Sequence, residues 1–74
     1  MQQSDEMRKK EIGNRVYMAR KNAHLSQMKL AEMAEMSNNS ISNIMLGKQV
    51  YNSDKLQQIT DVLSVPLRYL LNNS

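Results

Sequence analysis

The sequence predicts an all-α fold, a compact bundle of five helices. Apolar residues recur every three or four positions along most of the chain, which is the spacing of one helix face. Gly occurs twice and Pro once among 74 residues, so residues that form the tight turns of β-hairpins are scarce. A chain of this length forms at most one domain, which we expect at residues 5–74 behind a flexible arm at residues 1–4.

The first helix is expected over residues 5–22. Its apolar face consists of Ile12, Val16, Ala19 and Ala23. Gly13 lies in the middle of this helix, where a glycine costs about 1 kcal/mol relative to Ala. We therefore expect Gly13 to permit close packing against a neighbouring helix.

Two short helices are expected next, over residues 27–34 and 38–46, joined by a tight turn. Each follows a serine, Ser26 or Ser37, whose side-chain oxygen can accept a hydrogen bond from the first turn of the helix. Gly47 suits the left-handed position at which helices commonly end. The residues expected to face inward are Leu30, Ala31, Ala34, Ile41, Ile44 and Met45.

The last two helices are expected over residues 53–63 and 66–72. Asn52 or Ser53 can cap the fourth helix. Pro66 suits the first turn of the fifth helix, where its missing N–H does no harm. Their inward faces carry Leu56, Ile59, Thr60, Val62, Leu63, Leu67, Leu70 and Leu71.

The composition argues against several classes of function. The chain has no Cys and one His, so we expect no disulfide, no metal site and no cofactor. No apolar run approaches the ~20 residues of a membrane span, and the N-terminus lacks a signal-peptide core, so a cytoplasmic location is expected. We recognise no nucleophile–base pair and no Gly-rich phosphate loop, and therefore do not expect an enzyme. The net charge of +3 is compatible with a polyanionic partner.

The helix expected at 38–46 leaves an unusual polar face outward, made of Asn38, Asn39, Ser40 and Asn43. Asn and Ser in a helix interior cost several tenths of a kcal/mol relative to Ala or Lys. A helix that only needs a solvated face more often carries Glu, Lys and Arg. Short amides on a rigid helix therefore indicate a surface that reads another molecule; the alternative is a solvated surface of weak helix propensity.

Residues along the whole chain follow the pattern of one family. The first helix carries Ile12-Gly13-Asn14-Arg15-Val16 and Arg20. The paired helices carry Leu25-Ser26-Gln27, Leu30-Ala31, Ser37, Ile41-Ser42 and Gly47-Lys48. The last two carry Leu56, Ile59, Leu63-Ser64-Val65 and Leu70-Leu71. From Ile12 to Leu71 the chain resembles the helix-turn-helix DNA-binding domains of phage repressors, Cro proteins and their bacterial relatives, the lambda-repressor-like domains.

The resemblance implies sequence-specific binding of double-stranded DNA by a small transcriptional regulator, acting as a repressor. The helix at 38–46 would lie in the major groove of a near-palindromic operator. There Asn38, Asn39 and Asn43 can match the donor and acceptor of adenine together, and Ser40 can donate or accept. We expect contacted base pairs richer in A·T than in G·C, because this helix has no Arg to bind guanine.

Contacts to the DNA backbone are expected on both sides of this helix. The resemblance implies that Gln27 touches a phosphate and supports a base-reading residue of the next helix. Lys48 and Gln49 are placed to hold the backbone on the far side, and Arg20 and Lys21 on the near side. Solvated side chains are the alternative for the lysines and for Gln27. The cluster Arg8-Lys9-Lys10 is either a further contact or a feature that aids solubility.

A homodimer, at least on DNA, is the usual arrangement in the family. The expected interface is Val65, Pro66, Leu67, Tyr69 and Leu70, unless these side chains belong to the core, with Leu71 expected in the core. The chain leaves no room for an effector domain, so no small-molecule effector is expected. The rival function is a protein-interaction module of the same fold, an antitoxin or anti-repressor, in which DNA binding is secondary or lost.

Three residues depart from the family pattern. Glu35 stands where the turn usually has Gly, and Tyr51 stands where the loop before the fourth helix often has Pro. Met45 replaces an acidic residue that commonly pairs with the arginine at Arg20. We therefore expect Arg20 to find another partner among Glu11, Glu32, Asp61, solvent or phosphate.

Overall fold

The computed structural model describes residues 5–49 and 52–71, and this part of the chain contains helices and no strand. The helices are α1 (Asp5–Asn22), α2 (Gln27–Met33), α3 (Asn38–Met45), α4 (Ser53–Leu63) and α5 (Leu67–Leu71). The predicted all-α, five-helix fold is confirmed. The expectations for the arm at residues 1–4, for Tyr51 and for residues 72–74 fall outside the described residues.

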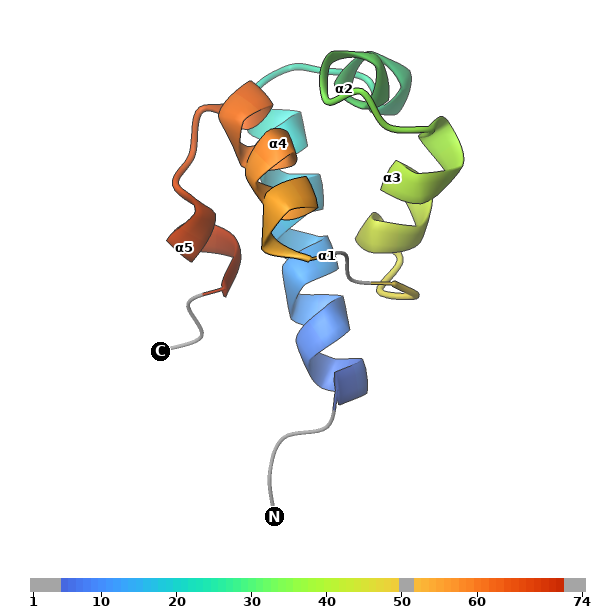
Figure 1. The fold of residues 1–74 in the computed structure, drawn as a ribbon, viewed down its shortest axis with the longest axis vertical. Coiled ribbons are helices and arrows are strands. Elements are labelled where there is room, and N and C mark those ends of the chain that lie inside the picture. The colour runs from blue at the N-terminus through green and yellow to red at the C-terminus, as the bar shows by residue number, and fades with distance from the viewer. Residues whose placement is uncertain (1–4, 50–51, 72–74) are drawn as a thin grey trace.

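The long helix α1 is the centre of the bundle (Figure 1). In that view α4 lies in front of it, α3 and α5 lie on opposite sides, and α2 lies above. α1 packs against α3 and α5, and α2 packs against α3 and α4. The paired helices α2 and α3 are therefore backed by the rest of the chain on one side only.

The core consists of the apolar faces that the helical spacing predicts. Its members are Ile12, Val16, Ala19, Leu30, Ala31, Ala34, Ile41, Ile44, Leu56, Ile59, Leu63 and Leu70, with Thr60 buried among them. Met45, expected inward, is half-buried. At the end of the chain, Leu70 is 1% exposed, whereas Leu71 is half-buried. Leu70 was expected either in the core or at the dimer interface and lies in the core, whereas Leu71, expected in the core, is only half-buried; α5 packs against α1 and α4.

Polar side chains cap the starts of α2, α3 and α4 as predicted. Ser26 Oγ accepts from Lys29 N, and Ser37 Oγ accepts from Ser40 N, each over 3.0 Å. Of the two candidates before α4, the cap is Asn52, whose Oδ1 accepts from Lys55 N over 3.0 Å.

The start of α5 differs by one residue from the prediction. Pro66 lies just before the helix, and its carbonyl accepts from Tyr69 N over 2.9 Å. The proline therefore supplies the first acceptor of α5 instead of lying within its first turn.

Among the described residues, four backbone positions have a positive φ: His24, Glu35, Gly47 and Ser64, at 60°, 58°, 76° and 62°. Each follows the end of a helix, α1, α2, α3 or α4. In every case the next residue donates its N–H five residues back, as Met36 does to Ala31 O and Lys48 to Asn43 O, both over 2.9 Å. This is the Schellman ending, in which a left-handed residue lets the chain return and satisfy carbonyls of the last turn.

Gly13 and Gly47 both lie where α1 meets the end of α3. A Cβ atom on Gly13 would collide with Ile44 O and would lie 2.7 Å from Met45 O. A Cβ atom on Gly47 would lie 2.8 Å from Lys10 Cγ. The close packing expected at Gly13 is confirmed, and it places the first half of α1 directly beside the last turn of α3.

Candidate nucleic-acid interface

The outward face of α3 carries the amides that the sequence singles out. Asn38 and Asn39 are exposed and Asn43 is half-buried, whereas Ile41 and Ile44 on the opposite side are fully buried. The two buried isoleucines fix the rotation of α3 about its axis. The polar side chains therefore project from a helix that cannot turn without exposing the core.

Gln27 joins the first turns of α2 and α3. Its Nε2 donates to Asn38 Oδ1 over 3.0 Å and lies 3.3 Å from the carbonyl oxygen of Asn38. An amide oxygen has two lone pairs, so Asn38 Oδ1 can still accept a second bond while its Nδ2 donates. The support of a base-reading candidate by Gln27, implied by the resemblance, is present in the structure.

The hydroxyl and backbone N–H of Ser40 are both hydrogen-bonded to Ser37. Its Oγ accepts from Ser37 Oγ over 2.8 Å, and its backbone N donates to the same hydroxyl. The Ser40 side chain is half-buried and forms part of the N-terminal cap of α3. It therefore has less capacity than Asn38 or Asn39 to distinguish one base from another.

The loop after α3 begins with the Schellman turn at Gly47 and then presents Lys48 and Gln49, both exposed. Gln49 N donates back to Asn43 O over 3.3 Å, and Asn43 Nδ2 lies 3.5 Å from Gln49 Oε1. The loop is thus tied to the last turn of α3. Lys48 and Gln49 lie just beyond the end of α3.

Arg20 binds a backbone carbonyl, and none of the three acidic residues proposed for it is its partner. Its Nη1 donates to Leu25 O over 2.7 Å, and its guanidinium lies 5.4 Å from the centre of the Tyr17 ring. Leu25 N in turn donates to Arg20 O over 3.2 Å. Arg20 therefore closes the turn from α1 to α2, just before the cap of α2. Lys21 is exposed, with its ammonium 5.9 Å from the same ring.

A family model described as a helix-turn-helix domain matches residues 13–74. The chain belongs to the helix-turn-helix domain family. It is also similar in structure to a transcriptional regulator of the HTH_3 family from Vibrio cholerae, with a TM-score of 0.85 and 24% identity. The similarity covers 96% of this chain and 40% of that chain, so this chain spans less than half of the regulator's length. No curated protein matches.

The family assignment supports a role in DNA-binding regulation. The structural likeness, at 24% identity, supports the fold. In this helix-turn-helix domain α2 and α3 are the paired helices, and Glu35 takes the left-handed position in the turn after α2.

Three exposed aromatic or apolar residues lie on or next to the paired helices and α1. Tyr17 is 41% exposed, Met28 is 70% exposed beside Gln27, and Leu46 is 60% exposed at the end of α3. The four-residue spacing of Tyr17 and Lys21 is the one signal in the sequence for the ring contact between them. Met28 carries no such signal, because an apolar residue next to a buried stripe is expected in the core.

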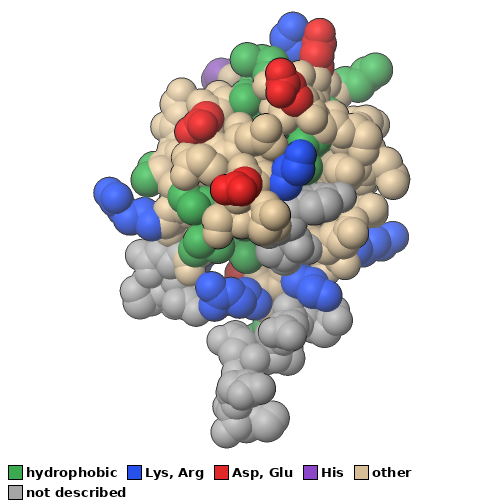
Figure 2. All heavy atoms as spheres, in the orientation of Figure 1, with side chains coloured by type: hydrophobic (Ala, Val, Ile, Leu, Met, Phe, Trp, Pro, Cys, Tyr) green, Lys and Arg blue, Asp and Glu red, His purple; other side chains and the backbone are tan. Residues whose placement is uncertain are grey.

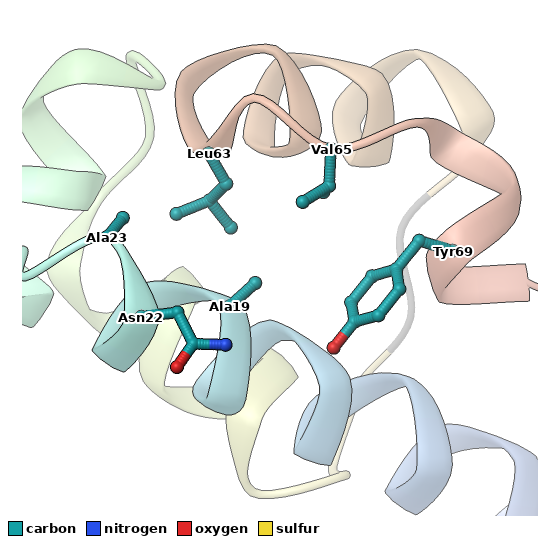
Figure 3. A pocket seen from close by; sticks show the side chains of 6 residues that line it. All are labelled: Ala19, Asn22, Ala23, Leu63, Val65 and Tyr69. Atoms are coloured by element: carbon teal, nitrogen blue, oxygen red, sulfur yellow. The ribbon is translucent and has the colours of Figure 1, made fainter.

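The surface predicted to form a dimer lies at α5 and the chain leading into it. Pro66 and Tyr69 are exposed, and Val65 and Leu67 are half-buried. A cavity of about 200 Å³ opens there, lined by Ala19, Asn22, Ala23, Leu63, Val65 and Tyr69 (Figure 3). Leu70 is buried inside the helix-turn-helix domain itself, so its side chain lies beneath this surface.

Charges are unevenly distributed over the domain. Figure 2 shows acidic side chains across the face on which α4 lies, while most Lys and Arg side chains project from its rim. Among residues 5–49 and 52–71, no group of three or more acidic or His side chains could hold a metal ion. No helix in the described part of the chain is long and apolar enough to cross a membrane.

Proposed function

We propose that this helix-turn-helix domain binds double-stranded DNA in a sequence-specific way and acts as a small transcriptional repressor of the lambda-repressor-like kind. α3 enters the major groove with its N-terminus toward the bases. The observation that carries the proposal is the outward amide face of α3, held in one rotation by buried Ile41 and Ile44.

Base reading falls to Asn38, Asn39 and Asn43. The amide of each can accept from N6 and donate to N7 of adenine, and a good pair of this kind discriminates by about 1–3 kcal/mol. Gln27 holds the Asn38 amide in place before DNA arrives, which reduces the entropy lost on binding. Ser40 makes a smaller contribution, because its hydroxyl is engaged with Ser37.

One domain covers half of a near-palindromic operator, so two copies bind side by side. We place the contact between copies at Val65, Pro66, Leu67 and Tyr69. Support comes from the exposed Pro66 and Tyr69 beside the apolar cavity, since a side chain of the second copy can fill a hollow of that size. The buried Leu70 would support this surface from below.

The proposal is tested by selecting binding sites from random duplex DNA and by a gel shift on the selected duplex. We expect A·T pairs at most contacted positions. The double variant Asn39→Ala/Asn43→Ala should lose specific binding while keeping the circular dichroism and melting temperature of the wild type. Selection of guanine at most contacted positions, or equal binding by the double variant, would overturn the assignment of the reading residues.

The second candidate function is a protein-interaction module of the same fold, an antitoxin or anti-repressor. The exposed apolar residues Met28, on α2, and Leu46, directly after α3, favour it. If DNA binding is lost under this function, the selection from random DNA would return no preferred sequence. Met28→Ser/Leu46→Ser would then weaken partner binding, whereas changes at the asparagines would not.

A further inference from the structure

Arg15 ties the middle of α1 to the end of α5. Its Nη1 donates to Leu70 O over 3.3 Å and to Tyr69 O over 3.4 Å. These carbonyl groups lie 55 and 54 residues further along the chain, and the Arg15 side chain is half-buried between the two helices. One side chain on α1 therefore fixes the backbone of α5 at its C-terminal turn.

α5 is too short to be stable by itself. It has five residues, Leu67–Leu71, whereas isolated helices shorter than about 12–15 residues are marginal in water. The carbonyl groups of its last four residues have no partner within the helix, and a cation near a helix C-terminus is favourable. Arg15 supplies donors and the charge, and Leu70, which is 1% exposed, supplies the apolar contact. The position of α5 therefore depends on these tertiary contacts.

The cavity at α5 lies one helical turn beyond Arg15. Ala19, four residues after Arg15 and on the same side of α1, lines the cavity from α1, and Tyr69 lines it from α5. Figure 3 shows the Tyr69 ring reaching from α5 toward α1. Because Arg15 binds the carbonyl group of Tyr69 itself, it holds the two walls of the cavity together at one end.

The packing of the helices connects the proposed dimer surface to α3. The residues at which we place the contact between copies, Val65, Pro66, Leu67 and Tyr69, belong to α5 or lead into it. α5 packs on α1, and α1 packs on α3. The distance between the two α3 helices of a dimer is therefore set through α1 of each copy. Half-sites lie about one helical turn apart, and one added base pair moves a half-site by ~3.4 Å and turns it by about 35°.

From these contacts we infer that Arg15 is a positioning residue of the DNA-bound dimer. By fixing α5 on α1, it sets the separation of the two α3 helices and hence the half-site spacing that the protein accepts. The inference rests on the proposed function, because it needs two copies on one operator. In this role Arg15 acts through the position of α5, so the spacing of an operator is recognised separately from its bases.

The test measures cooperativity, which is the affinity of the second copy relative to the first on a duplex with two half-sites. A duplex with one half-site gives the affinity of a single copy. The two-site duplex selected by the wild type is compared with versions whose spacer is one base pair longer or shorter. Arg15→Gln removes the charged donor. Arg8→Gln, the control, removes the same charge from an exposed arginine of the same helix.

We expect Arg15→Gln to keep the wild-type affinity for the one-site duplex. A bond from a charged donor is worth about tenfold in an equilibrium constant. If that takes the docked form of α5 from about 90% to about half in each copy, cooperativity falls about threefold, because both copies need a docked α5. The preference for the selected spacing should fall by the same factor of about three. Arg8→Gln should keep both, since a phosphate contact that each copy makes on its own does not change cooperativity.

Two further measurements separate positioning from a general loss of stability. The Tyr69 amide donates to Pro66 O, and the Met36 amide donates to Ala31 O, each over 2.9 Å. In Arg15→Gln, hydrogen exchange should become about tenfold faster at the Tyr69 amide and stay unchanged at the Met36 amide. Arg15→Lys retains the charge and three donors, so it should be more cooperative than Arg15→Gln.

Four results would overturn the inference. They are unchanged cooperativity in Arg15→Gln, equal losses in Arg15→Gln and Arg8→Gln, equal cooperativity in Arg15→Gln and Arg15→Lys, and weaker binding of Arg15→Gln to the one-site duplex. The last result would mean that Arg15 supports the whole domain instead of α5. Each applies when the wild type selects a sequence and binds two half-sites cooperatively. If the wild type selects no sequence, or fills two half-sites independently, the proposed function itself is wrong.

Discussion

Gln27 Nε2 lies 3.0 Å from Asn38 Oδ1, and this hydrogen bond joins the first turn of α2 to the first turn of α3. The first-turn residue of one helix thereby sets the rotamer of a residue that we propose reads DNA. Both side chains belong to short helices whose caps, Ser26 and Ser37, hold their first turns in place. The relationship can be tested, because it predicts an effect on DNA binding from a residue that need not touch a base.

Replacement of Gln27 by Ala should weaken binding to the selected duplex by about 1 kcal/mol, or roughly fivefold in Kd, since Asn38 loses the hydrogen bond that orients it. Fluorescence anisotropy measures this effect. The matched control is Gln57→Ala on α4, whose amide bonds to Asp61 Oδ1 over 2.8 Å and lies outside the helix pair. If the two variants bind equally well, the Gln27–Asn38 bond has no role in recognition.

Arg20 and Lys21 are adjacent cations with different expected roles. Arg20→Gln should lower the free energy of unfolding by about 1–2 kcal/mol, because Leu25 O loses a bond from a charged donor in the turn between α1 and α2. Lys21→Gln should change it by less than about 0.5 kcal/mol, since Lys21 is exposed. Urea denaturation of both variants gives the two values. Similar stability of the two would contradict a structural role for Arg20 and favour its predicted phosphate contact.

Replacement of Gly13 by Ala should destabilise the domain, although Ala is the better helix former. The added methyl group would collide with Ile44 O and lie 2.7 Å from Met45 O, and backbone of α3 cannot move aside cheaply. Overpacking of this kind costs about 1–3 kcal/mol. Thermal melting measures the loss, with Asn14→Ala as the control at the next, exposed position. A higher melting temperature for Gly13→Ala would show that α1 and α3 are not in such close contact.

Replacement of Glu35 by Gly should stabilise the domain. Glu35 has a φ of 58°, where a residue with a Cβ atom is strained and glycine is not. The free energy of unfolding should rise by about 0.5–1 kcal/mol, because the greater freedom of glycine in the unfolded chain offsets part of the relieved strain. The control is Glu32→Gly within α2, which should cost about 1 kcal/mol. Urea denaturation should show higher stability for Glu35→Gly and lower stability for Glu32→Gly. A loss of stability in both variants would contradict the left-handed conformation of Glu35.

The helix ends show where sequence reasoning succeeded and where it did not. Gly47 was predicted as a left-handed end, because glycine is the residue that signals one. His24 and Ser64 adopt the same conformation without that signal. Their endings are stabilised by backbone hydrogen bonds, Leu25 N to Arg20 O and Val65 N to Thr60 O, and by the packing of half-buried Leu25 and Val65 against the core. Such backbone hydrogen bonds depend on the path of the chain, so the residue types at these positions do not predict them.

The sequence by itself determined the five helices and the amide face of α3. Apolar residues at helical spacing locate the core side of each helix, and the polar side then follows by geometry. The caps Ser26 and Ser37 were likewise predictable, because a cap depends on its own first turn, whereas the choice of Asn52 over Ser53 came from the structure.

Tertiary structure decided which of several chemically suitable partners each residue meets. Leu70 and Leu71 are neighbours of one type, and the packing of α5 against α1 and α4 makes Leu70 the buried one. Arg20 had several possible acceptors, and the return of the chain at His24 brought Leu25 O within 2.7 Å. α1 and the last turn of α3 meet because Gly13 has no Cβ atom to collide with Ile44 O. These outcomes depend on contacts between residues far apart in the chain, which local spacing does not encode.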